Sequence, residues 1–228
     1  MRSKRIYVFL SLIPVLMLMG GVSLSGKALA ADHNPAQAGL AANQRVSLAL
    51  QPNVSQSPAT YSGYTRVNDN EDKITLQIPV EWNDIETGEW TYKGRKVGVF
   101  VAASGDLGNF YASRSQAGVL IGVSHALAHR YSQAGLLDLE KREHAGACVY
   151  KGRFDFQNMF YLGQYDQFNN CANGTPNLLV LTTASADQKS LIMLRMVVVS
   201  QADLEAVDKI LSSFQVLGDP EVDDHHDE

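Results

Sequence analysis

Alternating apolar and polar side chains predict strands along the middle of the chain. From Lys73 to Trp82 every second residue is apolar, which is the period of a strand with one buried face. Pro79 has no amide N–H, so this strand should lie at a sheet edge or end there. Further alternating or short apolar runs predict strands over residues 97–101, 117–123, 148–156, 159–168, 177–183 and 191–199.

Apolar residues at helical spacing predict one helix between the strands at 97–101 and 117–123 and another after the strand at 117–123. Asp106 can cap a short helix that ends near Arg114. A second helical stretch begins after Ser124, and Gly135 is expected to interrupt it before residues 136–143.

The last predicted helix has the clearest start. Ser200 and Asp203 have the spacing of a capping box in front of an amphipathic stretch that reaches Phe214. The preceding strands are joined by short turns, which favours antiparallel pairing. The chain is therefore predicted to be α+β, a layered sandwich in which helices cover a mainly antiparallel sheet.

The first thirty residues have the order of a signal peptide. Basic residues within 1–5 precede an apolar run from Ile6 to Leu24, and small residues follow at Ala28 and Ala30. We predict cleavage after Ala30 and hence a secreted or periplasmic protein. An uncleaved membrane anchor is the alternative.

The composition of the rest of the chain predicts a leader, one folded domain and a tail. Residues 31–58 lack periodicity and predict a flexible leader, a folded domain is expected over 59–217, and the acidic residues 218–228 predict a disordered tail. Loss of residues 1–30 removes four basic residues and no acid, which changes the formal charge from −5 to −9. This charge disfavours nucleic acid and, after cleavage, anionic membranes as partners.

Two cysteines, Cys148 and Cys171, lie in the exported part on neighbouring predicted strands. In an oxidising compartment such a pair indicates a disulfide. A reactive thiol or a metal-binding pair is the alternative.

Several runs resemble a known family. These are Ile78 to Trp82, Ala103 to Tyr111, and the paired strands that hold the two cysteines. They resemble the PsbP-like module that is appended to some bacterial secreted trypsin-like proteases and also occurs alone. The resemblance covers the chain from about Tyr61 to Val216. It implies a sheet-centred binding or assembly module without enzymatic activity, and it carries over no catalytic residue.

The sequence offers one serine beside a histidine, at Ser124 and His125. Neighbouring residues on a helix do not face each other, and Ser124 fits as a helix cap. A serine hydrolase is therefore the alternative function and not the favoured one.

A weak metal motif is formed by His125 and His129, which are four residues apart and would project from one helix face. His144 is a conceivable third ligand. The motif lacks the glutamate of catalytic zinc helices, so a solvent-exposed face is the favoured interpretation.

Aromatic residues are dense in the two strands that flank residue 158. They could line a ligand groove, with core packing as the competing interpretation. The candidate groove residues are Tyr150, Arg153, Phe154, Tyr161 and Tyr165.

Together these features predict an exported, non-catalytic binding or accessory module that acts through another exported protein and needs no cofactor. An exported metal-binding protein is a further alternative. Asn53 and Asn173 match glycosylation acceptors in loops.

Overall fold

The computed structural model describes residues 60–217, with gaps at 93, 172–175 and 186. Several predictions fall outside the described residues: the signal peptide over 1–30, the leader over 31–58, the tail over 218–228, and the acceptors Asn53 and Asn173.

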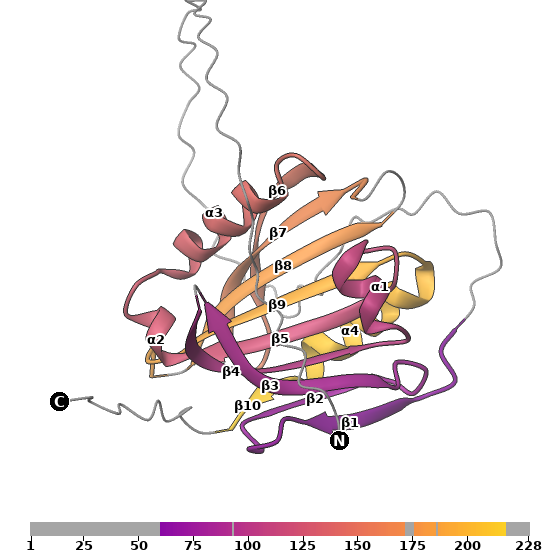
Figure 1. Cartoon of the computed structure of the whole chain (residues 1–228), viewed down its shortest axis with the longest axis horizontal. Helices are drawn as coiled ribbons and strands as arrows, with labels where there is room; N and C mark the ends of the chain where they lie inside the picture. Colours follow the sequence, from indigo (N-terminus) through magenta and orange to yellow (C-terminus); the bar gives the residue numbers. More distant parts are fainter. Residues whose placement is uncertain (1–59, 93, 172–175, 186, 218–228) are drawn as a thin grey trace, which may run out of the picture. The chain divides into compact units, whose positions relative to one another are not determined.

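Seven of the described strands form one antiparallel sheet (Figure 1). Its strand order is β3-β4-β5-β9-β8-β7-β6, so β3 and β6 are the two edges. The strands are β3 (Asp84–Tyr92), β4 (Arg95–Ser104), β5 (Gly118–Ser124), β6 (Val149–Gln157), β7 (Leu162–Asn169), β8 (Asn177–Ala184) and β9 (Leu191–Val198).

A smaller antiparallel sheet consists of three described strands in the order β1-β2-β10. These are β1 (Tyr64–Asn68), β2 (Ile74–Pro79) and β10 (Gln215–Val216). The strand predicted from Lys73 is therefore a central strand that ends at Pro79, and β10 pairs only with its start, at Ile74 and Thr75. Val80, expected on the buried face, is 42% exposed because it lies beyond the end of the strand.

Helices lie on both faces of the seven-stranded sheet (Figure 1). Leu120, Val180 and Met193 point to the face that carries α1 (Leu107–Ala112), α2 (His125–Ala128) and α3 (Gln133–His144). The opposite face carries α4 (Gln201–Ser213), which contacts β9 and also the smaller sheet through β2. The architecture is α+β, as the sequence predicts.

Local capping explains where the helices begin. Ser200 and Asp203 form the predicted capping box at the start of α4. The prediction that Gly135 interrupts the second helical stretch is wrong. The chain leaves the helix after Ala128 and starts again at Ser132, whose side chain accepts a hydrogen bond from Gly135 N. Gly135 therefore lies in the first turn of α3.

Among the described residues, no helix is both long enough and apolar enough to cross a membrane.

Candidate functional site

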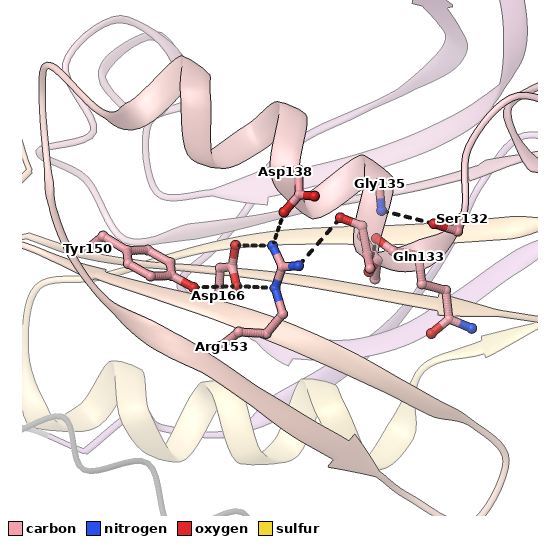
Figure 2. Close-up of polar contacts among 9 residues, drawn as sticks. Ser132, Gln133, Gly135, Asp138, Tyr150, Arg153 and Asp166 are labelled. Atoms are coloured by element: carbon pink, nitrogen blue, oxygen red, sulfur yellow. Dashed lines mark hydrogen bonds and ion pairs between the residues drawn. The ribbon is translucent and has the colours of Figure 1, made fainter. Parts of the chain in front are cut away.

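Arg153 is the centre of a polar network between α3, β6 and β7 (Figure 2). Its Nε and Nη2 bind the two carboxylate oxygens of Asp166 at 2.8 and 2.9 Å. Nη2 also lies 2.9 Å from Asp138 Oδ1 on α3, and Tyr150 donates its hydroxyl proton to Asp166 at 3.3 Å. The network therefore joins a helix to two strands.

One guanidinium serves two carboxylates in this network. Asp166 is fully buried, and its bidentate pair with Arg153 is the strong geometry for such a contact. Hydrogen bonds to Asp166 raise the pKa of Arg153, while burial and then the charge of Asp166 raise the pKa of Tyr150. Since these groups contact one another and join α3 to β6 and β7, the network acts as a structural clamp.

A second arginine binds the other side of α3. Arg195 on β9 contacts both carboxylate oxygens of Glu140 at 2.6 and 2.7 Å and Glu143 at 3.2 Å. Burial by itself raises the pKa of Glu140, but the charge of Arg195 and the contacts with His144 and Arg195 lower it to about 2.

The predicted groove residues lie on two faces of the sheet. Tyr150 and Arg153 point toward α3, as their contacts with Asp166 show. Tyr165 precedes Asp166 in β7, so it points to the α4 face, where Phe154 stacks on it at 5.3 Å. Tyr161 stacks on Phe214 at 4.8 Å, next to α4. The structure therefore does not bring the five residues into one groove.

The structure brings together two of the three predicted metal ligands. The Nε2 atoms of His125 and His129 lie 3.1 Å apart. His144 is buried on α3, with its ring against Phe168 at 5.4 Å. The described residues contain no group of three or more His, Cys, Asp or Glu side chains that could hold a metal ion.

Ser124 is committed to the backbone. Its buried hydroxyl donates to Val97 O at 2.5 Å and accepts from Leu127 N at 2.9 Å, where it caps α2. His125 contacts His129 and not this hydroxyl. The arrangement supports a helix cap and gives the serine no base.

A pocket of about 370 Å³ lies beside the start of α3. Ala134 lines it, and the carbonyl of Ala134 accepts a long 3.5 Å hydrogen bond from Arg153, so the pocket adjoins the clamp. Acids, bases and metal ligands are missing from the lining, which consists of Ala128, Tyr131, Ser132, Gln133, Ala134, Gln164, Ala184, Gln188 and Leu191. The sequence does not indicate this pocket, because its lining combines residues 128–134 with the distant residues Gln164 and 184–191.

The turn between β6 and β7, together with the first residue of β7, presents three large apolar side chains to water. Met159 is 89% exposed, Leu162 66% and Phe160 47%. We call these three residues the apolar tip. The strand predicted over 159–168 is right for Leu162 but wrong for Met159 and Phe160, which lie in the turn, and Asn158 in front of them is typical of a turn.

Asn158 fixes the backbone of this turn. Its side-chain oxygen accepts from Phe160 N at 2.8 Å and from Tyr161 N at 2.7 Å, and its side-chain nitrogen donates to Leu211 O at 2.9 Å. The apolar tip is therefore tied to the end of α4.

Cys148 and Cys171 form the predicted disulfide. Cys148 directly precedes β6 and Cys171 follows β7, so the bond closes the open end of this hairpin. The β6–β7 hairpin is thus fastened at both ends.

No family model matches the chain, and no curated protein matches it either. Among solved structures, the solution structure of cyanobacterial PsbP (CyanoP) from Synechocystis sp. PCC 6803 is similar to it. The similarity covers 72% of this chain and 98% of that chain, with 12% sequence identity and a TM-score of 0.40. This is the family that the sequence motifs resemble, but at such a TM-score the likeness carries no argument about this chain. The link to secreted proteases stays a prediction.

Proposed function

We propose that this chain is an exported, non-catalytic binding module that docks another exported protein at the apolar tip. The observation that carries the proposal is a firmly held turn that keeps Met159, Phe160 and Leu162 in water.

Exposed large apolar side chains that lie together are typical of interaction sites, because a partner that covers them removes apolar surface from water. The hydrogen bonds of Asn158 order this turn before binding, so docking loses little backbone entropy. The unbranched side chain of Met159 can adapt to the shape of a partner's groove.

Charge favours a protein over a lipid surface or a nucleic acid as partner. Between Arg153 and Lys189 the sequence contains no lysine or arginine. The apolar tip and β7 therefore lack the cations that bind anionic headgroups and phosphates. Export is supported by the predicted signal peptide and by the disulfide, because such bonds persist in oxidising compartments.

The test is photo-crosslinking in the native exported fraction with a reactive group placed at Gln157, next to the tip. The chain should crosslink one protein other than a second copy of itself, and the double variant Met159→Asp, Leu162→Asp should lose that product. Ile85→Asp is the matched control, because Ile85 is 42% exposed on the other edge strand. Equal crosslinking by the tip variant, or loss in both variants, would overturn the proposal.

A further inference from the structure

The outer edge of β6 is open among the described residues. In the seven-stranded sheet β6 is the last strand and pairs with β7 alone. Its first part is guarded, because the ladder has an irregularity between Tyr150 and Gly152 with Lys151 at that point. From Gly152 to Gln157 the pairing with β7 runs without interruption. Six consecutive residues therefore offer a regular edge to another strand.

The two faces of this edge carry different chemistry. Arg153 and Asp155 lie on the α3 face, where Asp155 accepts from Gln164 at 3.2 Å. Phe154 lies between them on the α4 face and is 42% exposed. The charge order around the phenylalanine is therefore positive, apolar, negative.

This order is self-complementary. We propose that two copies of this chain pair through β6, antiparallel and with Phe154 opposite Phe154 of the partner subunit. A two-fold axis at that position places Arg153 opposite Asp155 of the partner subunit, and it repeats the pair on the other side. Both side chains lie on the same face of the joined sheet, at the separation of a cross-strand pair. Nε and Nη2 of Arg153 stay with Asp166 and Asp138, and Nη1, whose contact with Ala134 O is 3.5 Å long, would meet the carboxylate of the partner subunit.

Neighbouring registers are less favourable. A two-fold axis at residue 153 would set two arginines opposite each other, and an axis at 155 would do the same with two aspartates. Like charges directly opposite destabilise a strand pair. The register centred on Phe154 gives two opposite-charge pairs without such a clash, and it extends the stack of Phe154 on Tyr165 across the interface.

The other edge of the sheet differs in charge. In β3 the charged residues are Asp84, Glu86 and Glu89, with no base. Two copies of β3 would repel each other, which is a common way to protect an edge strand. Self-pairing is therefore specific to β6. It would form a small, weak interface, and it uses residues other than the apolar tip.

Disulfide trapping tests the register. In the full exported chain, Phe154→Cys should give a covalent dimer under mild oxidation, because the two-fold axis places the same residue on both sides. Gln157→Cys is the matched control on the same strand, since in this register it faces Lys151 of the partner subunit. Failure of Phe154→Cys to crosslink, or equal crosslinking by both variants, would overturn the proposal.

Sedimentation tests the association itself. The unmodified chain should dimerise reversibly, and Asp155→Arg should raise the dissociation constant about tenfold or more, since two opposite-charge pairs become like-charge pairs. Glu205→Arg, an exposed site on α4, should leave the constant unchanged.

A chain that stays monomeric up to its solubility limit would overturn self-pairing. So would equal weakening by Asp155→Arg and Glu205→Arg. The chain could also be monomeric and lose its crosslink to the exported partner on Asp155→Arg. That result would show that another protein occupies the edge of β6, and it would overturn self-pairing as well. If the chain dimerises as expected but crosslinks no other exported protein at the apolar tip, only the proposed function would be contradicted.

Discussion

Two arginines hold α3 to the sheet from opposite sides. Arg153 on β6 reaches Asp138, and Arg195 on β9 reaches Glu140, while the helix itself packs on β7 and β8 between them. Each guanidinium has a buried or nearly buried carboxylate as its main partner. Such pairs are costly to desolvate, so removing one member leaves the other without compensation.

Asp166→Asn should therefore lower the free energy of unfolding by about 3 kcal/mol. The amide keeps the volume of the carboxylate but removes the charge that Arg153 and Tyr150 contact. Urea denaturation followed by circular dichroism measures the change.

Asp138→Asn is the control for that variant. Asp138 is 59% exposed, so its ion pair with Arg153 should contribute about 1 kcal/mol or less. Equal losses for both variants would contradict the assignment of Asp166 as the main partner.

Glu140 should make stability depend on acid pH. Its pKa lies at about 2 in the folded chain, against an ordinary value of 4.5. A carboxyl with a lowered pKa stabilises the fold above its ordinary pKa, and this contribution is lost as the pH falls from about 4.5 to about 2. Denaturation midpoints measured over this range should fall with pH, and Glu140→Gln should flatten part of the slope. An unchanged slope would count against the pair with Arg195.

At the scale of elements, the β6–β7 hairpin is unusual in being fixed at both ends. The disulfide between Cys148 and Cys171 closes its open end, and Asn158 ties its turn to Leu211 at the end of α4. Fixing both ends lets an edge hairpin hold apolar side chains in water without local fraying. This is the geometry that a docking element needs.

Replacing both cysteines by alanine should destabilise the fold by about 3 kcal/mol, the chain-entropy value for a loop of this length. The cysteines lie 23 positions apart, and their bond lowers the conformational entropy of the unfolded chain. Thermal unfolding of the variant should resemble that of the reduced wild-type chain. A variant as stable as the oxidised chain would refute this role of the bond.

At the scale of the whole molecule, Phe214 connects the two sheets. It is fully buried at the C-cap of α4, directly before β10 of the smaller sheet. Its ring stacks on Tyr161 at 4.8 Å and on Phe156 at 6.3 Å, both from the β6–β7 segment. One side chain therefore links the smaller sheet, α4 and an edge hairpin of the larger sheet.

Phe214→Ala should lower the free energy of unfolding by about 3 to 5 kcal/mol, because it leaves a cavity where these elements meet. Leu217→Ala, at a position that is 51% exposed, should change little. Hydrogen exchange should show faster opening in both sheets of the Phe214 variant. Faster exchange confined to α4 would argue against a connecting role.

Sequence patterns were sufficient where neighbours along the chain decide the structure. The strands around Val180 and Leu194 follow apolar runs, and the capping box of α4 follows from Ser200 and Asp203. The sequence patterns did not predict β3. This edge strand buries little apolar surface, and its Ile85 is 42% exposed. The patterns also placed the helix break at Gly135, where the cap of Ser132 decides the start.

Candidate sites were harder to predict than elements. Arg153 was expected beside Phe154 in a groove, but successive strand residues point to opposite faces, and only the arginine reaches Asp166. His144 is a conceivable third ligand beside His125 and His129 in the sequence, whereas packing buries it against Phe168. The alternation along the predicted strand already separates Arg153 from Phe154, but which element covers each face, and hence the partners of Arg153 and His144, depends on packing.

The sequence by itself determined the α+β class, the alternating faces of the strands and the cap of α4, and it allowed only one disulfide, between Cys148 and Cys171. These depend on periodicity, on residues a few positions apart, or on there being only two cysteines. The tertiary structure alone decided that β6 is an edge, that Asp166 lies under Arg153, and that Met159 projects into water. Such properties arise from strand order and packing between distant segments, on which local spacing places no constraint.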